Sequence, residues 1–191
     1  MDETFITDPS PAATDTPAAL RIARQLEESS SLDGLVAQLD GLLERTLGRS
    51  PTLTSLLRGH SVGHPLHPLL TDLPIGLWSS ATVLDVFGGR SARGAADCLV
   101  LLGELAALPT IAAGLADWRV GDERIRRVGL VHAGLNAAAL MLYDTSWLLR
   151  RIGSRRAGVT LSLAGAATLV ASGYLGGHLT FRLGSPRDDH T

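Results

Sequence analysis

The stretch AGVTLSLAGAATLVASGYLGGHL, residues 157–179, decides the fold, because it contains no Asp, Glu or Arg over 23 residues. An α-helix rises about 1.5 Å per residue and the hydrocarbon core of a bilayer is about 30 Å thick, so this stretch is long enough to cross a membrane. Three other stretches of twenty or more residues carry few charges, at 69–88, 95–116 and 128–149. We expect each of the four to be a membrane span.

The links between these stretches are short and contain Arg: GGRSARGA, DWRVGDERIRR and RRIGSRR. Short links make consecutive helices antiparallel neighbours. The sequence therefore predicts an all-α protein with an up-down-up-down four-helix transmembrane bundle over residues 51–184. A buried soluble bundle is the alternative, and the scarcity of a polar face disfavours it. Eight flanking Arg on one side against six on the other predict a cell-membrane protein with both termini cytoplasmic.

The start of the chain has a different composition. Residues 1–50 hold nine acidic residues and four Arg, whereas the whole 191-residue chain is 45% hydrophobic, 19% charged and without Lys. We interpret residues 1–18 as a disordered tail, 19–50 as a soluble amphipathic helical arm and 185–191 as a C-terminal tail. Within the arm, apolar residues recur at steps of three and four over 31–47, which predicts one helix with an apolar stripe. Docking of this stripe on protein is expected in preference to a second copy or a lipid surface.

Composition also excludes classes of function. One Cys excludes a disulfide framework and a cysteine-rich metal site. A net charge of −2 does not indicate the positively charged surface that nucleic-acid binding requires. No nucleophile–base arrangement, phosphate loop or HExxH motif is recognisable, so a stand-alone enzyme is not expected.

The predicted topology gathers histidines on one membrane side. The start of the first span, the end of the second, the start of the third and the end of the fourth share that side, and they hold His64, His67, Asp72, Asp117, His132, Asn136 and His178. Each histidine alone has a structural explanation, such as hydrogen bonding near a helix start. Histidines that converge from three helices predict a cofactor-binding or metal-binding site. Asn136 lies one turn after His132 and is expected to orient its ring.

Imidazoles on facing helices suit either a b-type haem between two histidines or a transition metal held by three histidines and a carboxylate. The expected cofactor-binding residues are His64, His67, His132, His178, Asn136 and Gly177. The expected metal ligands are drawn from His67, His132, His178, Asp72 and Asp117. The glycines beside His178 allow either a macrocycle or a neighbouring helix to approach closely.

Four strings of this sequence resemble a known bacterial family: GHPLHPLLTDLPIGLW at 63–78, AGLADW at 113–118, GLVHAGLN at 129–136 and GYLGGHLTFRLG at 173–184. They resemble the predicted integral membrane proteins called domain of unknown function 2231, over about residues 50–184. The resemblance implies a multi-pass membrane module whose shared positions include His64, His67, Asp117, His132, Gly177 and His178. It implies no activity. Some relatives continue into a Rieske-type iron–sulfur domain, and this analogy suggests electron transfer.

Three hypotheses follow. The leading one is a membrane module that binds haem or a metal at its histidine cluster and transfers electrons with a partner such as an iron–sulfur protein. The second is a non-catalytic membrane anchor or assembly subunit whose His and Pro residues shape the bundle. The third is a small solute or proton carrier that uses Glu104, an ionisable residue in the middle of its span. The bilayer is a partner in all three, and the sequence leaves homo-oligomerisation open.

Overall fold

The computed structural model describes residues 16–186, and within this range it is helical, with no β-strand. Four long helices form the main body: α4 (Leu66–Phe87), α5 (Arg93–Arg119), α6 (Glu123–Arg151) and α7 (Arg155–Phe181). The all-α prediction with four long packed helices is confirmed. Most of the predicted disordered tail, residues 1–18, and of the predicted C-terminal tail, residues 185–191, lies outside the described residues.

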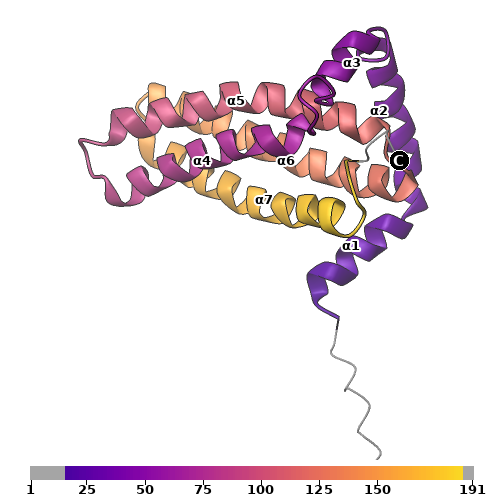
Figure 1. Ribbon diagram of the computed structural model, residues 1–191. Coiled ribbons are helices and arrows are strands. Elements are labelled where there is room, and N and C mark those ends of the chain that lie inside the picture. Colours follow the sequence, from indigo (N-terminus) through magenta and orange to yellow (C-terminus); the bar gives the residue numbers. More distant parts are fainter. Residues whose placement is uncertain (1–15, 187–191) are drawn as a thin grey trace, which may run out of the picture.

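The four long helices lie side by side in one elongated bundle (Figure 1). Along the ring, α4 packs on α5, α5 on α6, α6 on α7 and α7 on α4. Consecutive helices run antiparallel, because the turns that join them span only a few residues. One end of the bundle therefore collects the start of α4, the end of α5, the start of α6 and the end of α7, as the sequence predicted.

Aromatic stacking occupies the middle of the bundle. The rings of Trp78 on α4 and Tyr143 on α6 stack with their centroids 4.3 Å apart. The indole lies directly on α5, where it donates a hydrogen bond to the carbonyl of Val100 over 3.2 Å. A Cβ at Gly103 would lie 2.3 Å from the indole nitrogen, so this contact requires glycine. Gly103 on α5 thus makes room for the Trp78 ring in the core.

The sides of the bundle are apolar and exposed, which is the reverse of a soluble protein. Large apolar side chains point outward from all four helices: Leu73, Val83, Val86, Leu101, Leu105, Leu108, Met141, Leu148, Leu163 and Val170. By length and composition, α5 and α7 qualify as helices that can cross a membrane, and α4 and α6 do not meet that test. The four-span arrangement at 69–88, 95–116, 128–149 and 157–179 therefore stays a prediction.

The N-terminal arm lies across one end of the bundle (Figure 1). It consists of α1 (Ala18–Glu28), a 3-10 turn at Ser30–Leu32, α2 (Asp33–Thr46) and α3 (Pro51–Leu57). Both α1 and α2 pack on α6, so the arm docks on protein. Two leucines of the predicted apolar stripe, Leu35 and Leu42, are more than half exposed. The other members of the stripe are buried or partly buried: Leu32, Val36, Leu39, Leu43 and Leu47. The acidic side of α2 faces the bundle because arginines line that end of the bundle.

Candidate functional site

The structure brings together two of the predicted histidines, one from α4 and one from α6. The ring centroids of His67 and His132 are 6.4 Å apart and the ring planes are nearly perpendicular, at 88°. Both side chains lie at the arm end of the bundle and both are partly buried. This pair is the centre of the candidate site.

A backbone carbonyl of α5 holds the His67 ring. Its Nδ1 lies 2.9 Å from the carbonyl oxygen of Thr110. Because a carbonyl only accepts, Nδ1 must carry the proton, which leaves Nε2 with its lone pair. A Cβ at Gly114 would lie 2.7 Å from this Nδ1, so the glycine on α5 leaves the space that the ring fills.

The His132 ring is held in the same way by α7. Its Nδ1 lies 2.9 Å from the carbonyl oxygen of Ser172, and its Nε2 lies 3.0 Å from Nδ2 of Asn136. The Ser172 hydroxyl donates to Oδ1 of Asn136 over 2.8 Å. These contacts fix both the tautomer of the ring and the position of the amide beside it, so Asn136 contacts His132 as its spacing of four residues predicted.

The glycines near the end of α7 were expected to admit either a macrocycle or a neighbouring helix. Gly176 admits the neighbouring helix, since a Cβ there would lie 3.1 Å from Cε1 of His132. Gly177 faces no ring from another helix, and the nearest atom to its added Cβ belongs to Phe181 of the same helix. No contact in the described residues therefore connects Gly177 with the histidine pair.

His178 does not join the pair, although it lies at the same end of the bundle. Its Nε2 is 2.7 Å from Oε1 of Glu27 on α1, and the residue is only 6% exposed. The contact joins the last turn of α7 to the N-terminal arm. His64, in the loop before α4, is exposed. The six expected cofactor-binding residues are therefore divided among separate places.

The two carboxylates expected as metal ligands also lie apart from the pair. Asp72 is exposed on α4. Asp117 is buried and faces Arg58, with 3.9 Å between its Oδ1 and the Arg58 Nε. Within residues 16–186, no three His, Cys, Asp or Glu side chains are close enough to hold a metal ion together. The predicted ligand set is therefore not assembled there, because helix rotation turns its members toward different neighbours.

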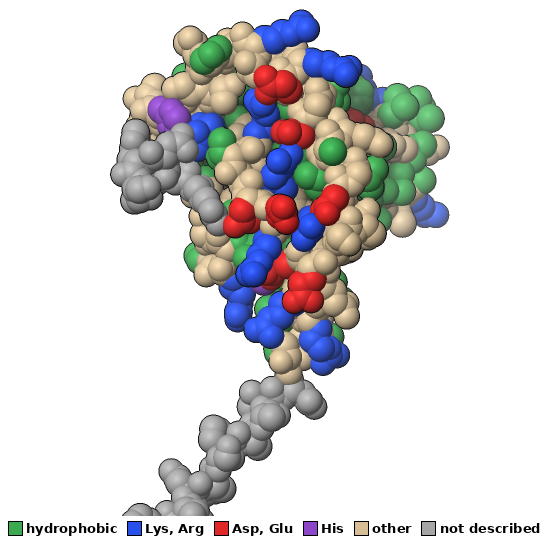
Figure 2. All heavy atoms as spheres, turned by 90° about the vertical axis from the view of Figure 1, so that its right-hand side faces the viewer, with side chains coloured by type: hydrophobic (Ala, Val, Ile, Leu, Met, Phe, Trp, Pro, Cys, Tyr) green, Lys and Arg blue, Asp and Glu red, His purple; other side chains and the backbone are tan. Residues whose placement is uncertain are grey.

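Ion pairs hold the arm on the bundle. Acidic side chains of α2 face arginines of α5 and α6 in a row that Figure 2 shows as alternating acidic and basic groups. The row consists of Asp33 with Arg127, Asp40 with Arg126, and Glu44 with Arg119. The two hydrogen bonds from Arg127, at 2.6 and 2.8 Å, hold the pKa of Asp33 below its ordinary value. Sequence reasoning missed this row, because it weighed the arginines only as topology markers.

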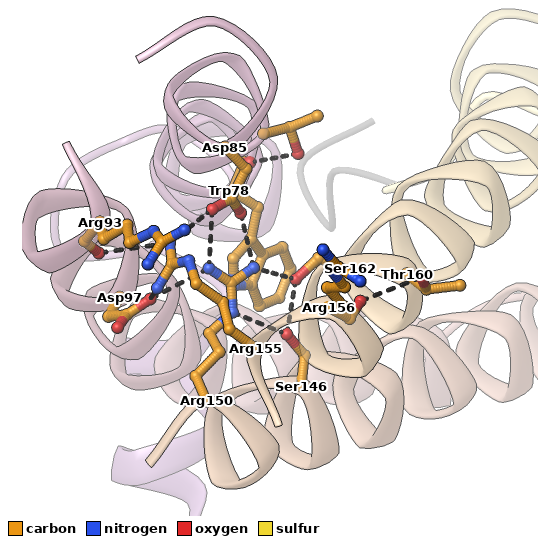
Figure 3. A network of polar contacts seen from close by, with 11 residues as sticks. Trp78, Asp85, Arg93, Asp97, Ser146, Arg150, Arg155, Arg156, Thr160 and Ser162 are labelled. Atoms are coloured by element: carbon orange, nitrogen blue, oxygen red, sulfur yellow. Dashed lines mark hydrogen bonds and ion pairs between the residues drawn. The ribbon is translucent and has the colours of Figure 1, made fainter. Parts of the chain in front are cut away.

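The opposite end of the bundle holds a second polar cluster, centred on Arg150 (Figure 3). The Arg150 side chain is fully buried and pairs with Asp85 over 2.6 Å and with Asp97 over 3.0 Å. Arg155 contacts the same two carboxylates. Every carboxylate in this cluster has an arginine partner, which indicates a structural tie between α4, α5, α6 and α7.

Comparison with known proteins places most of this structure in one family. The family model described as a predicted membrane protein (DUF2231) matches residues 63–187. The match contains all four long helices and both histidines of the pair. No curated protein and no solved structure matches the chain.

Proposed function

The chain belongs to the DUF2231 family of predicted membrane proteins, and we propose that within the membrane it is a non-catalytic anchor or assembly subunit. In this proposal all four long helices cross the bilayer and the docked arm lies at one membrane surface. Both chain ends are then on the arm side of the membrane, which we propose to be cytoplasmic. The exposed apolar sides of the bundle support contact with lipid.

One observation carries this proposal: the three histidines that lie within the helix packing each tie one element to another. His67 joins α4 to α5, His132 joins α6 to α7, and His178 joins α7 to the arm. Buried polar groups that are satisfied inside the chain stabilise one arrangement of helices. The motif residues then serve to shape a rigid module that holds another protein at the membrane.

A second candidate function, electron transfer through a bound haem or metal, is favoured by the His67 and His132 pair. Both rings have Nδ1 anchored to a carbonyl, which is the usual support for a ligating histidine, and the Nε2 atoms remain as the ligand atoms. His67 and His132 would hold such a group through these nitrogens, and a haem b held there would supply one-electron transfer. Asn136 would have to release the Nε2 of His132. An iron–sulfur protein is the redox partner that we propose for this case.

Purification in mild detergent separates the two candidates. The full chain is produced in cells supplied with a haem precursor and transition metals, and its absorption spectrum and metal content are measured. The anchor predicts neither Soret absorption nor a stoichiometric metal. A haem or metal present at one per chain, and lost in both His67→Ala and His132→Ala, would overturn the anchor and support electron transfer.

The histidine variants test the anchor directly. His132→Ala and His178→Ala should each lower stability by about 1–3 kcal/mol, because each leaves a buried polar group without its partner. Both should still migrate at the wild-type size on native gels of solubilised membranes. His64→Ala is the matched control, since His64 is exposed and should change neither quantity. Loss of the native-gel complex without loss of stability would contradict a purely structural role.

A further inference from the structure

A pocket of about 290 Å³ opens on the side of the bundle between α5 and α6. Its walls are mostly apolar, from Leu101, Leu105, Leu108, Leu140 and Trp147. The three leucines of α5 are 37%, 55% and 58% exposed, so the pocket opens sideways, where the proposed bilayer lies. Two carboxyl groups, those of Glu104 and Asp144, line the same pocket.

Glu104 is a buried carboxyl group without a basic partner among the described residues. The residue is only 8% exposed, and neither of its carboxyl oxygens has a hydrogen-bond partner among the described residues. The side chain that acts on it is Asp144, a second carboxyl group. Two carboxyl groups can hydrogen-bond only by sharing a proton, and this contact supplies neither of them with a basic partner. Burying an unsatisfied polar group costs about 1–3 kcal/mol, more when it is charged, so the Glu104 carboxyl in this apolar pocket calls for a donor from outside this chain. Asp144 is exposed and adds a second carboxyl group at the pocket.

The depth of the pocket limits what can fill it. Glu104 lies 11 residues after the first residue of α5 and 15 before its last, or about 16 Å and 22 Å along the helix. It is therefore near the middle of the proposed span, and the pocket opens to the side of the helices. An ion from water would have to cross hydrocarbon to reach it, whereas a side chain on a neighbouring helix would arrive by helix packing.

We propose that this pocket receives a Lys or Arg side chain from a transmembrane helix of a partner protein. The inference rests on the proposed assembly function, and it identifies the chemistry by which the partner is recognised. A basic side chain supplies the donor that the Glu104 carboxyl lacks and an opposite charge for Asp144, and the leucines around it pack against the partner helix. A second copy of this chain does not offer such a group, because its arginines lie near the helix ends.

Model transmembrane peptides test the proposal with the full chain in lipid vesicles. The peptides are leucine-rich helices of about 23 residues with Lys, Leu or Glu at the centre, labelled with an acceptor dye. Cys98 is exposed and is the one cysteine of the chain, six residues before Glu104, so it can carry the donor dye. Energy transfer then reports association. The Lys peptide should bind about threefold to thirtyfold more tightly than the Leu peptide, as polar contacts between membrane helices allow.

Two variants and one control assign the preference to the pocket. Glu104→Gln and Asp144→Asn should each reduce the Lys preference to about twofold or less, and binding of the Leu peptide reports that each variant still presents a folded apolar surface. Glu123→Gln is the control, because the Glu123 side chain is 87% exposed at the start of α6. It should keep the full preference.

Equal binding of the Lys and Leu peptides to the wild-type chain would overturn the proposal. Self-association of the labelled chain that the Lys peptide does not displace, and that Glu104→Gln abolishes, would also overturn it by assigning the pocket to a second copy. The result is independent of the haem and metal measurement. A Lys preference without a native complex would count against assembly alone, and a native complex without a Lys preference would count against this pocket alone.

Discussion

Replacing Arg150 by Met should be the most destabilising single change at the end of the bundle opposite the arm. The Arg150 guanidinium donates five hydrogen bonds, to the carboxylates of Asp85 and Asp97 and to two serine hydroxyls. The two serines, Ser146 on α6 and Ser162 on α7, also hydrogen-bond to each other over 2.7 Å. One side chain therefore connects four helices.

The magnitude follows from what the substitution leaves behind. The Arg150 side chain is 0% exposed and that of Asp85 is 2% exposed, so Met would leave the carboxylate buried with Arg155 as its one remaining basic partner. Removing one partner of a buried ion pair costs about 3–5 kcal/mol. The unfolding equilibrium should therefore shift by about 10²-fold to 10⁴-fold. Arg155→Met is the comparison variant and should lower stability by less, since that side chain is 20% exposed and Asp85 keeps its contact with the fully buried Arg150.

Unfolding by SDS in mixed micelles measures these differences. Tryptophan fluorescence is a suitable signal because Trp78 is 4% exposed and stacked on Tyr143. The double variant Arg150→Met with Asp85→Leu should recover most of the lost stability, because no buried charge then remains without its partner. A loss below about 1 kcal/mol for Arg150→Met, or a double variant no more stable than the single one, would refute the reasoning.

Two further predictions concern the core and the arm. Gly103→Ala should destabilise by about 1–3 kcal/mol in the same SDS titration, because its Cβ would meet the Trp78 indole at 2.3 Å. Gly134→Ala, whose Cβ would have no atom within 4 Å, should be neutral or stabilising, and equal effects of the two would contradict this packing. Because the pKa of Asp33 is lowered in the docked arm, its contribution to docking is complete above the ordinary Asp value of about 3.9 and is lost as the pH falls through the lowered value. Hydrogen exchange of α2, corrected for its intrinsic pH dependence, should therefore rise between pH 5 and pH 3, and by less in Asp33→Asn; a flat profile in the wild type would count against the ion pair.

Part of the candidate site could be predicted from the sequence. The topology placed His67 and His132 at one end of the bundle, and the spacing of four residues put Asn136 beside His132, where it lies. The partner of His178 could not be predicted, because Glu27 lies 151 residues away in a segment outside the bundle. The ion pairs of α2 could not be predicted for the same reason, since the arginines that attract Asp33 and Asp40 are distant in sequence.

The sequence by itself determined that four long helices form and that they alternate in direction. These properties depend on local hydrophobicity and on link length, which are readable one segment at a time. Only the tertiary structure decided which polar groups meet. Whether a histidine faces another histidine, a carbonyl or the arm depends on the rotation of each helix about its axis, and close contacts at residues such as Gly103 and Gly114 set that rotation. The same packing left Glu104 without a basic partner in the part of the chain that the structure describes, a property that apolar composition alone does not reveal.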